Sequence, residues 1–79
     1  MKSLPELIYE AKEEYRHHER REPILLDGTS EMHARNALNH LLNDSWDEAL
    51  TEATMASSQR SRWQRFAEIV RMICELNAK

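Results

Sequence analysis

The sequence predicts an all-α protein: a small bundle of three to four helices that we expect to be dimeric. Glycine occurs once and proline twice in 79 residues. The strong helix formers Ala, Leu, Glu, Arg and Met are plentiful. β-branched residues are few and never alternate with polar ones over the length of a strand. A chain of this length forms at most one domain, so residues 1–79 are treated as a single helical unit.

The first helix is expected over residues 4–21. Ser3 and Glu6 have the spacing of a capping box, and Pro5 is tolerated in the first helical turn. Pro23 ends the helix at about Glu22 or earlier. The inward-facing apolar stripe comprises Leu4, Leu7, Ile8, Ala11 and Tyr15, and Tyr9 lies opposite it.

Two further helices are expected over residues 30–42 and 46–57. A short apolar connection, Ile24–Leu26, precedes the first of them, and Asn43 to Ser45 separates the two. Ser45 and Glu48 again have capping-box spacing. The predicted core stripes are Ala34, Ala37, Leu38, Leu41 and Leu42, followed by Trp46, Ala49, Leu50, Ala53 and Ala56. The second stripe is rich in alanine, which predicts a close approach between helices.

The last helix is expected over residues 59–77, with Ser61 and Gln64 matching a third capping box. One continuous helix through residues 46–77 is the alternative, since no Gly or Pro intervenes. The apolar face comprises Trp63, Phe66, Ala67, Val70, Ile73 and Cys74.

Charge is distributed unevenly along the chain, whose net charge is −3. Residues 1–27 hold five bases and seven acids, residues 28–56 one base and five acids, and residues 57–79 five bases and two acids. The acidic middle and the basic end can match each other between packed helices. They can also orient a partner or a second copy of the chain.

The apolar arc of the last helix is wider than a surface helix of a small monomer needs, which is roughly 100°. Ile69, Met72 and Leu76 lie beside the main stripe, with Arg62 and Arg65 at their margin. An apolar centre with arginine around it is typical of a protein interface. Burial of the whole arc by helices of the same chain is the alternative. The predicted partner-binding residues are Arg62, Trp63, Arg65, Ile69, Met72 and Leu76, with a possible extension through Ile24–Leu26.

A second function class is DNA binding. Over six residues, Ser58 to Trp63 resembles recognition helices of some phage helix-turn-helix regulators. Gln and Arg side chains pair with adenine and guanine edges. The preceding helix carries four acids that phosphates would repel, and the turn glycine of such motifs is missing. The residues of this alternative are Gln59, Arg60, Arg62 and Arg65.

The sequence favours no catalytic, metal or cofactor chemistry. Glu14 and His17 have a metal-ligand spacing, but arginines surround them and the pattern has no second copy in the chain. The one cysteine, Cys74, faces the core and excludes an intrachain disulfide, as expected in a reducing cytosol. No apolar run could span a membrane, and the acidic N-terminus does not resemble a secretory signal.

These observations predict a cytoplasmic, non-enzymatic protein that binds another protein and forms a homodimer. Compact helical chains with few cysteines are often regulators or inhibitors encoded by bacteria and their phages, and we expect this class.

Overall fold

The computed structural model describes residues 2–19 and 30–78, and within these ranges the chain is helical with no strand. The elements are α1 (Leu4–His18), α2 (Ser30–Leu42), α3 (Trp46–Gln59), the 3-10 helix η1 (Ser61–Trp63) and α4 (Gln64–Asn77). The all-α prediction is confirmed. None of the helices in the described chain has the length and apolar character that a bilayer crossing requires.

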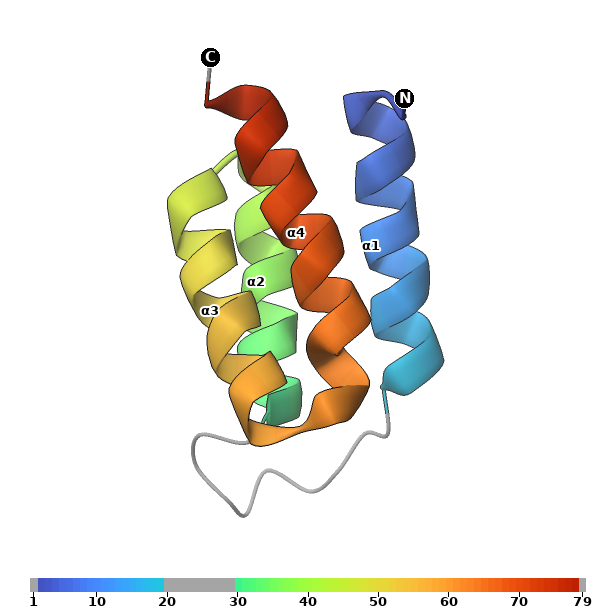
Figure 1. Ribbon diagram of the computed structural model, residues 1–79, viewed down its shortest axis with the longest axis vertical. Helices are drawn as coiled ribbons and strands as arrows, with labels where there is room; N and C mark the ends of the chain where they lie inside the picture. The colour runs from blue at the N-terminus through green and yellow to red at the C-terminus, as the bar shows by residue number, and fades with distance from the viewer. Residues whose placement is uncertain (1, 20–29, 79) are drawn as a thin grey trace.

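The four α-helices lie side by side along one long axis and alternate in direction (Figure 1). The molecule measures 39 × 21 × 20 Å along its principal axes. In this view α4 lies between α1 and α3, and it packs against both. Both ends of the described chain are therefore at the same end of the bundle, and α4 has neighbours on two sides.

Helix α1 begins as predicted and ends earlier than predicted. The Ser3 hydroxyl accepts a hydrogen bond from the Glu6 amide at 3.4 Å, and the Glu6 carboxylate accepts one from the Ser3 amide at 3.5 Å. This confirms the first capping box. The helix ends at His18 because Glu19 has an extended conformation, although its amide still donates to the Tyr15 carbonyl. The expected end at residue 21 is thus wrong, and residues 20–29, with Ile24–Leu26, lie outside the described residues.

Helices α2 and α3 pack through the small side chains that the sequence predicted. The buried alanines of this contact are Ala34, Ala37, Ala49, Ala53 and Ala56. Alanine leaves little side-chain volume between two helices, so their backbones approach closely. Leu42 was expected in the core and is instead 52% exposed, because α2 ends at this residue.

The connection between α2 and α3 is a Schellman-type turn. Asp44 has φ of 59°, in the left-handed region that disfavours residues with a Cβ atom. The Ser45 amide donates to the His40 carbonyl at 2.8 Å, and the Asp44 amide donates to the Leu41 carbonyl at 3.3 Å. These are the two bonds that define the motif, which usually has glycine at the left-handed position.

Replacing Asp44 with glycine is expected to raise the free energy of unfolding by about 0.5–1 kcal/mol, because glycine adopts positive φ without steric cost. Urea denaturation followed by circular dichroism measures the change. Asn43→Gly is the matched control, since Asn43 does not have positive φ, and it should lower stability or leave it unchanged. A loss of stability in Asp44→Gly would contradict the assigned turn.

Helices α3 and α4 are separate, with the break at Arg60, whose φ and ψ are −140° and 124°. The last α-helix therefore begins at Gln64 instead of residue 59, and η1 occupies the intervening turn. The capping boxes expected at Ser45 and Ser61 are wrong, because within the described ranges no side-chain cap bond forms at the start of α3, η1 or α4. The backbone of Ser45 takes part in the Schellman turn, where its amide donates to the His40 carbonyl, and Ser61 lies inside η1.

The core is centred on three aromatic side chains from α1, η1 and α4. The rings of Tyr15 and Trp63 stack with centroids 5.6 Å apart. Phe66 lies 5.8 Å from Trp63 and 6.4 Å from Tyr15, in tilted arrangements. Such pairs contribute about 0.5–1.5 kcal/mol beyond their burial. This cluster joins the C-terminal end of α1 to the N-terminal end of α4.

Candidate functional site

Two of the six predicted partner-binding residues belong to the core of the chain itself. Trp63 is 0% exposed and Ile69 is 1% exposed. Trp63 packs in the aromatic cluster, and Ile69 lies beneath the surface that α1 and α4 form together. Neither side chain is accessible to a partner in this structure, so both are corrected here to core residues. The physical reason is that α1 covers the side of α4 that the sequence left without a neighbour.

Arg62, a third predicted binding residue, is turned towards the interior. Its side chain is 15% exposed, and its Nη2 lies 3.8 Å from Oε1 of the buried Glu31. Its guanidinium carbon lies 5.4 Å from the ring centroid of Trp63, a cation–π distance. The arginine therefore covers the aromatic cluster and compensates a buried carboxylate of α2, and it is corrected to a structural residue.

The remaining three residues, Arg65, Met72 and Leu76, form an accessible edge of α4. With Ile69 beneath them they have the spacing i, i+4, i+7 and i+11, which places all four on one strip of the helix. Met72 is 38% exposed, whereas Leu76 is half-buried against the core. We call Arg65, Met72 and Leu76 the α4 edge.

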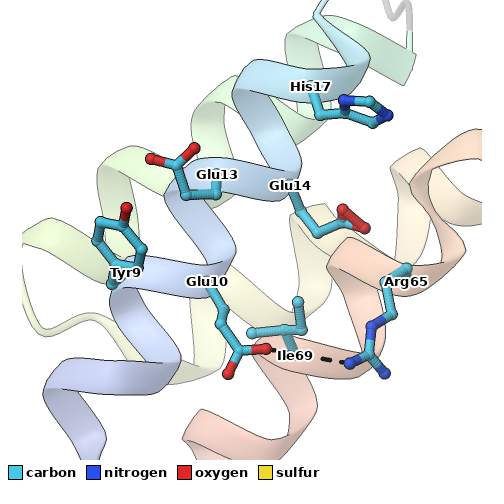
Figure 2. Close-up of a pocket in the computed structure, with 7 residues that line it drawn as sticks. All are labelled: Tyr9, Glu10, Glu13, Glu14, His17, Arg65 and Ile69. Atoms are coloured by element: carbon cyan, nitrogen blue, oxygen red, sulfur yellow. Dashed lines mark ion pairs between the residues drawn. The ribbon is translucent and has the colours of Figure 1, made fainter.

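A groove of about 430 Å³ runs between α1 and the part of α4 that carries Arg65. We call it the α1/α4 groove, and it is lined by Tyr9, Glu10, Glu13, Glu14, His17, Arg65 and Ile69. Figure 2 shows Glu14 extending towards Arg65, whereas Tyr9 and Glu13 extend away from α4. A second groove adjoins it on α1, lined by Lys2, Pro5, Glu6, Tyr9 and Glu10. The two grooves share Tyr9 and Glu10. Tyr9 is 63% exposed and lies opposite the apolar stripe, as the sequence predicted.

The ion pairs in the α1/α4 groove are long or lie at the surface. Arg65 lies 4.0 Å from Glu10 and 3.6 Å from Glu68. Glu10 also contacts Lys2, Glu13 lies 3.5 Å from Arg16, and His18 lies 3.8 Å from Glu14. Exposed pairs of this kind contribute roughly 0–1 kcal/mol each. The side chains can therefore be rearranged by a bound partner at small cost.

The residues of the DNA-binding alternative do not share one helix. Gln59 ends α3, Arg60 lies at the break, Arg62 is in η1 and Arg65 is in α4. A recognition helix presents successive turns of one helix to the major groove. Gln59 and Arg60 are exposed, but Arg62 is turned inward and Arg65 lies near two carboxylates. DNA binding stays a prediction that a gel shift at several salt concentrations can test.

His33 and Cys74, two side chains with reactive or metal-binding groups, make hydrogen bonds to other helices of the bundle. The Nδ1 of His33 on α2 lies 2.5 Å from Oε2 of Glu52 on α3. The Cys74 thiol donates to the Trp46 carbonyl at 3.0 Å. Burial raises the pKa of this thiol, and nearby carboxylates of Asp47 and Glu75 act in the same direction. A raised pKa disfavours the nucleophilic thiolate.

Within the described ranges, no group of three or more His, Cys, Asp or Glu side chains is arranged to hold a metal ion. Comparisons with protein-family models, with curated proteins and with solved structures gave no match. The functional inference therefore depends on the surface itself.

Proposed function

We propose that this protein acts without catalysis, as a regulator or inhibitor that binds another protein through the α4 edge and the neighbouring Tyr9 of α1. We call these four residues, Tyr9, Arg65, Met72 and Leu76, the docking face. The observation that carries the proposal is the groove between α1 and α4, with the exposed Tyr9 on one side and Arg65 of the α4 edge on the other.

The composition of the docking face supports this function. Tyr, Met and Arg are enriched at protein interfaces relative to the remaining surface. Tyr9 and Met72 are two of the four large apolar side chains that are exposed in the described chain; the others are Leu42 and Met55. Leu42 and Met55 lie on α2 and α3, away from the α1/α4 groove. Tyr9 lines the α1/α4 groove beside charged side chains, and Met72 lies two helical turns from Arg65, which lines the same groove.

The apolar surface left on α4 is smaller than the sequence suggested, because Ile69 is buried and Leu76 is half-buried. A face of this size fits a partner that supplies its own apolar and charged groups. In a more specific form of the proposal, the partner is a second copy of this chain, bound through the same face. A molar mass in solution of twice the 9.4 kDa of the single chain would support such a homodimer.

The variant Met72→Asp is expected to weaken capture of the partner roughly 10- to 100-fold, because burying a methionine side chain contributes about 1.5–3 kcal/mol. The immobilised protein is incubated with lysate of the organism that encodes it, and captured proteins are quantified by mass spectrometry. Met55→Asp is the matched control, since Met55 is 41% exposed on α3. The supporting result is a protein that wild type and Met55→Asp retain and Met72→Asp loses.

Equal capture by all three proteins would contradict the docking face, as would loss of capture in Met55→Asp alone. Circular dichroism and urea denaturation of each variant show whether a loss reflects unfolding. If the captured protein is the chain itself, wild type should have twice the mass of Met72→Asp in solution.

A further inference from the structure

We propose that the segment of the partner that enters the α1/α4 groove is cationic, with Lys or Arg side chains beside an apolar residue that packs on Tyr9. This inference rests on the proposed function, since it names the chemistry of the partner at the same face. It is drawn from the charges of the groove, from their accessibility and from a comparison with the other acidic groove of the bundle.

The lining of the α1/α4 groove carries three carboxylates and one guanidinium. The guanidinium of Arg65 is shared between Glu10 and Glu68, at 4.0 and 3.6 Å. Glu10 also contacts Lys2, so it is the best compensated of the three carboxylates. The lining itself therefore has two more carboxylates than guanidiniums, and the bases Lys2 and Arg16 lie beside Glu10 and Glu13 outside the lining.

Glu13 and Glu14 can accept new partners. The side chain of Glu13 is 46% exposed and lies 3.5 Å from the exposed Arg16, one turn along the same helix. The side chain of Glu14 is 24% exposed, and its contact is His18 at 3.8 Å, which is an ion pair only when the imidazole is protonated. Because Glu14 is partly shielded from water, a cation placed beside it is screened less than one on an open surface.

The arrangement of side chains favours a segment that is both charged and apolar. Tyr9 and Glu13 extend to the same side of α1, whereas Glu14 extends into the space next to Arg65 (Figure 2). A bound chain lying along α1 can thus place its cations at Glu13 and Glu14 and an apolar side chain on the ring of Tyr9. The adjoining groove continues this surface with Glu6 and Glu10. Phosphate groups would be repelled here, so the occupant is a protein segment and not a nucleic acid.

A second acidic groove lies between α2 and α3, lined by His40, Asp47, Glu48, Thr51 and Glu52. Its lining has no large apolar side chain, and Glu52 is already bound to His33. It shares the charge of the α1/α4 groove without the exposed aromatic residue. It therefore serves as the matched control for an effect of negative charge alone.

A phage-displayed library of random peptides, selected on the full-length protein, tests the proposal. Selected peptides are expected to be enriched in Lys and Arg together with an aromatic or aliphatic residue. The affinity of the synthesised peptides is then measured by isothermal titration calorimetry for wild type, for the double variant Glu13→Gln/Glu14→Gln and for the control Asp47→Asn/Glu48→Gln. We expect the peptides to bind Glu13→Gln/Glu14→Gln roughly three- to tenfold more weakly than wild type, and to bind the control as tightly as wild type. Added salt should weaken binding to wild type and reduce this difference, because it screens the charges that the variant lacks.

The outcomes separate this inference from the proposed function. Neutral or acidic peptides that bind wild type and lose binding to Met72→Asp would overturn the cationic segment and leave the docking face in place. Cationic peptides that bind both double variants as tightly as wild type, or that lose binding to the control, would also overturn the inference. Peptides unaffected by Met72→Asp, or a library that yields no binder, would overturn the docking face together with the cationic segment.

Discussion

Trp63→Ala is expected to lower the free energy of unfolding by about 3–5 kcal/mol, the range observed when a buried large aromatic residue is truncated. Trp63 is fully buried and contacts the rings of Tyr15, Phe66 and His18. A domain of this length has a total stability of only about 4–12 kcal/mol at typical values per residue. The variant should therefore be partly or wholly unfolded, which circular dichroism and urea denaturation at 25 °C would show.

Tyr9→Ala is the matched control, because it removes an aromatic residue from the exposed side of α1. Its expected effect on stability is within about 0.5 kcal/mol, since alanine has a higher helix propensity than tyrosine and little burial is lost. Trp63→Ala and its control also decide whether Trp63 belongs to the core or to the binding face that the sequence predicted. If Trp63→Ala stays fully stable and loses partner capture, the tryptophan belongs to the binding face that the sequence predicted. If it unfolds the protein, the tryptophan belongs to the core.

Helical periodicity predicted most of the core because it fixes the angular position of each side chain on its own helix. Leu7, Ala11 and Tyr15 of the α1 stripe and the alanines of α2 and α3 are buried as expected, whereas Leu4 and Ile8 are partly buried against the core. Periodicity does not say how many neighbours a helix has. The wide apolar arc of α4 was interpreted as one core face with a remainder, but α4 packs between α3 and α1. Cys74 faces Trp46 of α3 and Ile69 faces α1, so both sides of the arc are covered.

The candidate site was only partly predictable for the same reason. Arg65, Met72 and Leu76 could be assigned to the α4 edge from their spacing alone. The contribution of α1 could not, since the contact of Arg65 with Glu10 joins residues that are far apart in the sequence. The inward position of Arg62 could not be predicted from the sequence either, because it depends on a contact with the buried Glu31 of α2. Capping boxes failed where the preceding turn fixed the serine in another conformation, as at Ser45.

Arg62→Met is expected to lower the free energy of unfolding by about 3 kcal/mol, because it removes the guanidinium that lies 3.8 Å from the buried Glu31, a carboxylate on which Arg35 also acts. Breaking a buried ion pair from one side typically costs 3–5 kcal/mol. The lower end applies here, since the two side chains are 3.8 Å apart and Arg62 is 15% exposed. Methionine keeps an apolar chain over Trp63, so the loss reports on charge compensation more than on packing. Urea denaturation measures it.

The double variant Glu31→Leu/Arg62→Met should recover much of this loss, because neither buried charge remains. Replacing both members of a buried pair with apolar residues is often neutral or stabilising. In the double-mutant cycle with Glu31→Leu, the two single effects should therefore sum to about 1.5–3 kcal/mol more than the effect of the double variant. Additive effects would show that Arg62 does not compensate Glu31.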